Sequence, residues 1–215
     1  RERLVSARIG LLLKQPFFGN LATRLTLTNA DEWLTTAATD GRRFYYNSRF
    51  IMMLKPKEVE FLVAHEVLHV VYDHMGRRNH RDPQIWNIAD DYAVNADLKR
   101  HKVGQFITTV PCLYEQKYDG KAAEEIYDDL MKNAQKLDLD ALLDQLLDEH
   151  MDQEGDGEGD GDGVELRRLW REIHACNLKA ITRRGFDVRQ QASRQKRPYP
   201  TTQGAGGGKP PPTGR

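Results

Sequence analysis

The sequence has few of the features that secreted or membrane proteins depend on. Its 215 residues include two cysteines, Cys112 and Cys176, which lie far apart and form no CxxC motif. We therefore expect a protein of the reducing cytoplasm with no thiolate metal ligand. No segment approaches the roughly 18 consecutive apolar residues of a membrane-spanning helix, so we expect no membrane partner.

A net charge is also absent, because 32 basic and 32 acidic side chains balance. The chain as a whole has no field that would attract nucleic acid. The charges are nevertheless segregated. Residues 138–165 contain twelve carboxylates and no lysine or arginine, whereas residues 167–197 contain ten basic and two acidic residues. The basic stretch has few aromatic residues, so we expect a solvated helix face or a match for the acidic stretch, not nucleic-acid binding.

Composition divides the chain into four segments. We expect one folded domain over residues 1–151, where apolar residues recur at regular spacings. Residues 152–165 alternate glycine with acid and predict a flexible linker. A basic helical segment follows over 166–193, and the Pro/Gly-rich residues 194–215 predict a disordered tail.

Secondary structure in the first segment is expected to mix helices with a small sheet. Two β-rich runs, residues 33–38 and 43–46, flank Asp40-Gly41, a dipeptide that favours a tight hairpin. The spacing of apolar residues predicts helices over residues 2–14, 58–74, 85–99, 122–132 and 137–151.

The strongest chemical signal is the run at residues 65–69, which reads His-Glu-Val-Leu-His. Four residues make just over one helical turn, so His65 and His69 project from one face and can share a zinc ion. This HExxH pattern is typical of zinc peptidases, in which the metal acidifies a water molecule and polarises a carbonyl. Glu66 would then accept the water's proton as general base. The alternative is a pair of core histidines hydrogen-bonded to backbone.

The surroundings of this motif favour a metal. Its helix is apolar nearly all round and is therefore expected to be buried. A buried polar group without a partner costs on the order of 1–3 kcal/mol, so His65, Glu66 and His69 each need one. A single zinc ion per chain and its water would satisfy all three.

A catalytic zinc normally takes three protein ligands, so the motif needs a further one. His74 is close in sequence, but in a continuous helix it falls about 180° away from His65. It remains an alternative ligand that could bind only if the helix broke before it.

The helix over residues 85–99 offers a second source. Asn87, Asp91 and Asn95 recur every four residues and form a polar stripe beside an apolar face, whereas Asp90 and Asp97 are expected to face solvent. We therefore expect Asp91 to complete a His-His-Asp zinc site, with Asn87 or Asn95 orienting a ligand. The alternative is a helix-packing aspartate bonded to a neighbouring amide.

The order of these motifs resembles a family of bacterial and phage putative metallopeptidases that often carry a von Willebrand A-like domain behind the peptidase domain. The resemblance covers roughly residues 1–165. It is carried by Ala38-Thr39-Asp40-Gly41, Phe44-Tyr45-Tyr46-Asn47, the HExxH run with His74 and Arg77, and Trp86-Asn87-Ile88-Ala89 with Asp91 and Asn95.

This resemblance implies an α+β fold with a zincin-like core, in which a small sheet and the HExxH helix pack on further helices. It also implies zinc, an intracellular peptidase role, and an ATPase or other protein as a partner. It names no substrate beyond a protein or peptide. Only about fifty residues follow the linker, so we expect this chain to lack a complete A-like domain.

Two functions follow from these observations. In the first, the protein is a zinc-dependent endopeptidase that hydrolyses peptide bonds with Glu66 as general base. In the second, it is a catalytically idle metal-binding or interaction protein that acts as a partner in a larger assembly.

Overall fold

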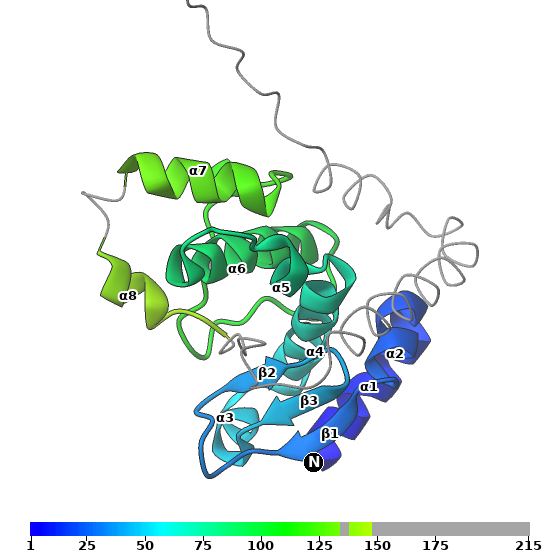
Figure 1. Cartoon of the computed structure of the whole chain (residues 1–215). Coiled ribbons are helices and arrows are strands. Elements are labelled where there is room, and N and C mark those ends of the chain that lie inside the picture. The colour runs from blue at the N-terminus through cyan, green and yellow to red at the C-terminus, as the bar shows by residue number, and fades with distance from the viewer. Residues whose placement is uncertain (134–137, 148–215) are drawn as a thin grey trace, which may run out of the picture.

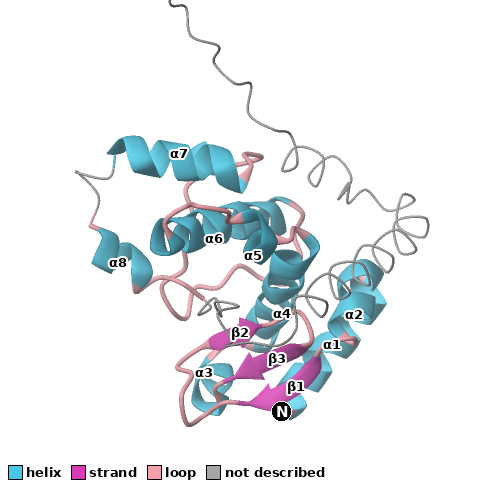
Figure 2. Ribbon diagram, viewed as in Figure 1, coloured by secondary structure: helices cyan, strands magenta, loops and turns pink. Residues whose placement is uncertain are grey.

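A computed structural model describes residues 1–133 and 138–147 of the chain. Within these residues the fold is α+β, as the sequence predicts, with helices packed around a small sheet (Figures 1 and 2). The strands are β1 (Thr26–Asn29), β2 (Ala37–Thr39) and β3 (Arg43–Tyr46). The helices are α1 (Glu2–Lys14), α2 (Pro16–Ala22), α3 (Ser48–Met53), α4 (Pro56–Val71), α5 (His74–Arg77), α6 (Pro83–Arg100), α7 (Ala123–Asn133) and α8 (Leu139–Leu143), with a 3-10 turn at Gln116–Tyr118.

In the described residues the strands form one sheet in the order β1-β3-β2, with β3 parallel to β1 and antiparallel to β2. The predicted hairpin is therefore present. Its turn is closed by Asp40, whose carboxylate accepts hydrogen bonds from the backbone N–H groups of Arg42 and Arg43. Its first strand begins at Ala37, not at residue 33, because the backbone of residues 30–34 turns back on itself before the strand.

Helix α4 carries the HExxH motif and is buried along almost its whole length. Pro56 occupies its first turn, where a missing N–H costs nothing. The helix ends at Val71, so the predicted extension to His74 is wrong. Asp73 adopts a left-handed conformation with φ 55°, which a continuous helix does not allow, and His74 begins the separate turn α5.

Helix α4 lies at the centre of the fold, between two groups of elements (Figure 1). Helices α1 and α2 and the sheet pack on one side of it and share one apolar core. Helix α6 packs on the other side and forms a second core with α7. The residues on facing sides of α4 and α6 therefore lie between two apolar layers, where water is excluded.

The remaining helices agree only in part with the sequence prediction. Helix α7 matches the predicted segment 122–132 to within one residue. The helix expected over 137–151 is shorter in the described residues, where α8 ends at Leu143. The predicted linker, basic segment and tail lie outside the described residues. None of the described helices has the length and apolar character required to cross a membrane.

The start of α4 is anchored by the buried carboxylate of Glu58. It accepts hydrogen bonds from the backbone N–H of Lys55 and from Thr108 and Thr109, and so ties the loop after α6 to the metal-motif helix. Gly104 lets the same loop approach closely. It has φ 64°, and a Cβ there would lie 2.5 Å from the backbone nitrogen of Phe61.

Glu58 should make stability depend on pH. Burial alone would raise the pKa of Glu58, but the hydrogen bonds from Thr109, Lys55 and Thr108 together lower it from 4.5 to about 2. A depressed carboxyl pKa contributes stability above the unfolded-state value, here about 3 kcal/mol, and that contribution is lost as pH falls from about 4.5 through about 2. Chemical denaturation of Glu58→Gln should show a stability deficit at pH 7 that narrows across this window. Glu32→Gln, at an exposed position, should show none.

Candidate metal centre

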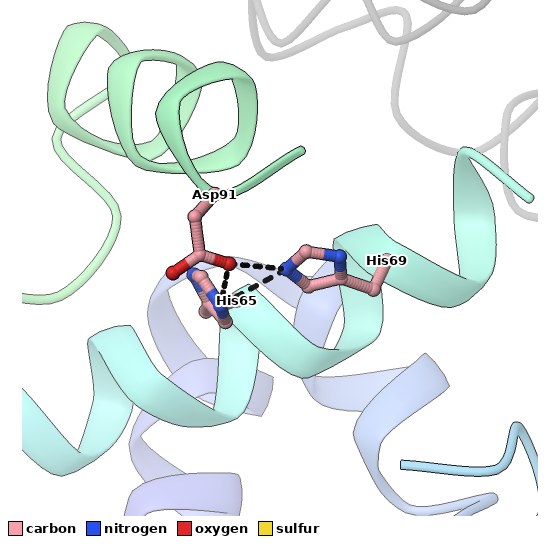
Figure 3. A group of neighbouring side chains, drawn as sticks. All are labelled: His65, His69 and Asp91. Atoms are coloured by element: carbon pink, nitrogen blue, oxygen red, sulfur yellow. Dashed lines mark hydrogen bonds and ion pairs between the residues drawn. The ribbon is translucent and has the colours of Figure 1, made fainter. Parts of the chain in front are cut away.

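The two histidines of the HExxH motif project from one face of α4 and are completely buried. The Nε2 atoms of His65 and His69 lie 2.9 Å apart. Asp91 reaches them from α6, and its Oδ1 atom lies 3.4 Å from each Nε2 (Figure 3). Three potential ligand atoms from two helices thus converge on one point.

The spacing of these atoms fits a bound metal ion. A tetrahedral zinc ion with bonds of about 2.0–2.2 Å keeps its ligand atoms about 3.3–3.6 Å apart. The two distances from Asp91 Oδ1 match this range, and the two imidazole nitrogens, 2.9 Å apart, would move apart by about 0.4 Å on binding the ion. Asp91 Oδ1 has no hydrogen-bond donor among the described residues, although it is fully buried. Its other oxygen accepts a hydrogen bond from the backbone N–H of Leu147 at 3.2 Å. Without a cation, Oδ1 would be a buried anionic atom lacking a donor, which is costly.

The charge of the region supports the same conclusion. Glu66, Asp90 and Asp91 are all buried on the facing sides of α4 and α6 or close to them, and no lysine or arginine in the described residues is buried to the same degree. A buried carboxylate carries a large desolvation cost that hydrogen bonds or a positive charge must compensate. A divalent cation would supply that charge.

Asn95 fixes the proton of His65. The amide oxygen Oδ1 of Asn95 lies 3.0 Å from His65 Nδ1, and its Nδ2 donates to the carbonyl oxygen of Leu113. Since an amide oxygen only accepts, His65 Nδ1 carries the proton and Nε2 keeps its lone pair. Asn87, the other predicted orienting residue, is half-buried, and no hydrogen bond in the described region joins it to this group.

Glu66 is fully buried in α4 directly after His65. In an ideal helix it projects about 60° from His69, so it lies on the flank of the face that carries the two imidazoles. Cys112, in contrast, does not belong to either group of converging ligand atoms in the described residues. Burial, followed by the negative charge of Asp91, raises the pKa of its thiol.

His74 lies beside the site but on a different side of His69 from Asp91. Because the chain turns at Asp73, His74 is brought back toward α4, and its Nδ1 lies 3.1 Å from Nδ1 of His69. The other ring nitrogen of His69, Nε2, faces His65 and Asp91. The helix therefore does break before His74, as the alternative prediction required, but His74 falls in a second group with His69 and Asp90 and not in the His65–His69–Asp91 group.

The burial of Asp90 was not predicted from the sequence. We expected it to face solvent together with Asp97, but both are buried, so that expectation is wrong. Asp97 accepts a hydrogen bond from the hydroxyl of Tyr72, and Asp90 Oδ1 lies 3.6 Å from His74 Nδ1. The sequence does contain an indication that Asp90 faces inward. The apolar residues Trp86 and Ala93, four before and three after Asp90, lie on the same helix face.

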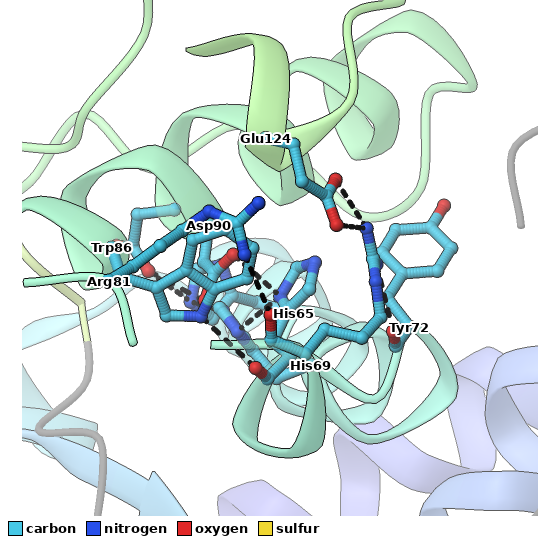
Figure 4. Close-up of polar contacts among 10 residues, drawn as sticks. His65, His69, Tyr72, Arg81, Trp86, Asp90 and Glu124 are labelled. Atoms are coloured by element: carbon cyan, nitrogen blue, oxygen red, sulfur yellow. Dashed lines mark hydrogen bonds and ion pairs between the residues drawn. The ribbon is translucent and has the colours of Figure 1, made fainter. Parts of the chain in front are cut away.

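A layer of polar contacts surrounds the histidines (Figure 4). The indole N–H of Trp86 donates to the carbonyl oxygen of His74 at 3.0 Å, and the guanidinium group of Arg81 lies 4.8 Å from the Trp86 ring. Arg77 forms an ion pair with Glu124 of α7. These contacts connect α5 to α6 and α7 and hold the turn that carries His74.

Removal of Asp91 should weaken metal binding more than removal of another buried acid on the same helix. We expect Asp91→Ala to lower zinc affinity roughly 100-fold or more, since even outer partners of a metal ligand contribute 10–100-fold. Asp97→Asn is the matched control and should keep wild-type affinity, because Asp97 bonds Tyr72 and not the metal group. Equilibrium dialysis with elemental analysis measures both. Equal affinities would remove Asp91 from the ligand set.

Comparison with known proteins gives one match. No curated protein and no solved structure matches the chain significantly. One family, described as a putative metallopeptidase domain, matches residues 1–204. Since that match spans nearly the whole sequence and the buried His-His-Asp group suits a metal ion, the chain belongs to this putative metallopeptidase domain family.

Proposed function

We propose that the protein is a zinc-dependent endopeptidase with a zincin-like core that hydrolyses peptide bonds. The observation that carries this proposal is the convergence of His65 Nε2, His69 Nε2 and Asp91 Oδ1 within 2.9–3.4 Å of one another on the facing sides of α4 and α6. Two imidazole nitrogens and one carboxylate oxygen suit zinc, and three protein ligands leave one position for the reactants.

The bound ion would supply Lewis-acid polarisation of the scissile carbonyl and lower the pKa of water toward neutrality. Glu66 then has the part of general base. A carboxylate oxygen of Glu66 accepts a proton from the attacking water and passes it to the leaving amine nitrogen. Its buried position keeps bulk water from competing for that proton.

Two further residues, Asn95 and Leu147, would orient the side chains that bind the metal. Asn95 holds the proton of His65 on Nδ1, which keeps the Nε2 lone pair directed at the metal position. The backbone N–H of Leu147 holds the second oxygen of Asp91, so that Oδ1 points at the two imidazoles. These contacts reduce the reorganisation that metal binding would otherwise require.

The substrate backbone would bind along β2, the edge strand beside α4. In an antiparallel pair, alternate residues of a strand direct their backbone N–H and C=O groups toward the neighbouring strand. The N–H of Asn47 donates to the carbonyl oxygen of Thr36, so the backbone groups of Thr36 face β3, and those of Ala37 and Thr39 face away from it. The carbonyl oxygen of Ala37 accepts a hydrogen bond from Thr36 Oγ1 at 3.5 Å, and the residues of β2 are at most 5% exposed, so a substrate strand would have to displace the side chains that cover this edge. An added strand there would give affinity with little sequence preference, which suits an endopeptidase acting on extended protein segments.

Access to the site requires movement of the chain, because the side chains of His65, Glu66, His69 and Asp91 are at most 1% exposed. The contact that covers Asp91 comes from Leu147, at the end of the described residues. Helix α8, which precedes it, has no fully buried residue, but its leucines pack against the core that α6 and α7 form. Displacement of the segment 138–147 would open the site and would expose Leu147, which is fully buried, so substrate binding would have to compensate that cost.

The alternative function is a catalytically idle metal-binding or interaction protein within a larger assembly, with an ATPase or another protein as partner. The complete burial of the site favours it, since a purely structural metal would need no access. Both functions are compatible with a cytoplasmic protein, which the low cysteine content favours.

Glu66→Gln separates the two functions. The variant should keep wild-type zinc affinity but lose cleavage of a fluorescein-labelled, unfolded casein by roughly 10²–10⁴-fold, the usual contribution of a general base. Glu60→Gln is the control: it lies on the same helix and binds Lys57, so its cleavage rate should match wild type. If Glu66→Gln cleaves as fast as wild type, the proposed mechanism is wrong. If zinc-loaded wild type cleaves nothing, the idle function is favoured.

A further inference from the structure

The second buried group of histidine and aspartate, formed by His69, His74 and Asp90, resembles a metal site in composition. We infer that it is instead a relay in which His74 is a positioning residue that holds His69 as a zinc ligand, and Asp90 balances the charge of the bound ion. This inference rests on the proposed function, because it takes zinc to bind at Nε2 of His69.

The proton on His69 decides how the relay works. A neutral imidazole has one N–H and one lone pair. If Nε2 gives its lone pair to the metal, the proton lies on Nδ1, and Nδ1 of His74 lies 3.1 Å from it. His74 Nδ1 therefore accepts this hydrogen bond, and the proton of His74 lies on its Nε2.

The same rule applies to the other zinc histidine. His65 Nδ1–H donates to Asn95 at 3.0 Å, as His69 Nδ1–H donates to His74 at 3.1 Å. Each imidazole thus has its Nε2 at the convergence point and its Nδ1 fixed by a buried acceptor. Metal-binding histidines usually donate their second N–H in this way, and the contact sets both tautomer and ring orientation.

Asp90 contributes charge. Its Oδ1 lies 3.6 Å from His74 Nδ1, which is too long for a hydrogen bond, and Nδ1 carries no proton in this tautomer, so Asp90 acts through its charge and not as a hydrogen-bond partner of that atom. Zinc bound by two neutral histidines and Asp91 carries one net positive charge. The buried carboxylate of Asp90, adjacent to Asp91 on α6, would balance it.

The relay is held rigidly by α6. Trp86 donates its indole N–H to the carbonyl oxygen of His74, and Tyr72 donates its hydroxyl to Asp97. These two contacts fasten both ends of the turn at Asp73 to the helix that carries Asp90 and Asp91. The break in α4 thereby places His74 where a continuous helix would not.

A second ion is disfavoured because both groups share His69. A neutral imidazole offers one lone pair, so ions at Nε2 and Nδ1 together would require the ring to lose its remaining proton. The relay therefore predicts one zinc per chain.

The test measures zinc affinity of the full chain by competition with a chromophoric chelator, and the visible absorption spectrum after cobalt substitution. His74→Leu removes the acceptor and should lower zinc affinity 10–100-fold and change the cobalt spectrum. His74→Asn returns an acceptor near the position of Nδ1 and should recover most of the affinity. Asp90→Asn should also lower affinity.

Tyr118→Phe is the matched control, because it removes the hydrogen bond of a buried tyrosine to Asp129, which involves neither the turn at Asp73 nor the relay. It should lower the free energy of unfolding and leave zinc affinity and the cobalt spectrum unchanged. If His74→Leu does not fold, the comparison of Asp90→Asn and His74→Asn with Tyr118→Phe decides the question.

Several outcomes would overturn the relay. Wild-type affinity in both His74→Leu and Asp90→Asn would exclude it while leaving the metal centre intact. Two zinc ions per wild-type chain, falling to one in His74→Leu, would show that the group is a second metal site. A wild-type chain that binds no zinc would overturn the relay together with the proposed function.

Discussion

The structure depends on the burial of ionisable groups where α4 and α6 face each other. Three histidines and the acidic residues Glu66, Asp90 and Asp91 lie between two apolar cores with no lysine or arginine buried among them in the described residues. Such an arrangement is expensive unless a cation compensates the acids. A divalent metal would reduce that cost, so we expect metal binding and the stability of this helix pair to be linked.

Helix α6 organises the site. Asp91 faces the two histidines of the HExxH motif, Asn95 binds His65, and Trp86 binds the backbone of His74. All of these residues belong to one helix, so a single packing geometry between α4 and α6 sets the ligands and the contacts that orient them. The turn at Asp73 adds the one feature that a straight helix pair lacks, an acceptor for His69.

Local patterns in the sequence were sufficient for part of this arrangement. The four-residue spacing of His65 and His69 depends on helix geometry alone, and the polar stripe of α6 indicated Asp91 and Asn95 as inward-facing. No local sequence pattern predicts the left-handed conformation of Asp73, because the turn is held by tertiary contacts of Tyr72 and Trp86. Asp90 was misplaced because a helix covered by both α4 and α7 has no solvent face at that position, a fact of packing that periodicity does not contain.

The most direct test of this account is the position of the metal in a crystal of the zinc-loaded protein, measured by anomalous scattering at the zinc absorption edge. The account predicts one peak per chain, within about 2.0–2.2 Å of His65 Nε2, His69 Nε2 and a carboxylate oxygen of Asp91. A peak among His69 Nδ1, His74 and Asp90, or no peak between α4 and α6, would contradict it.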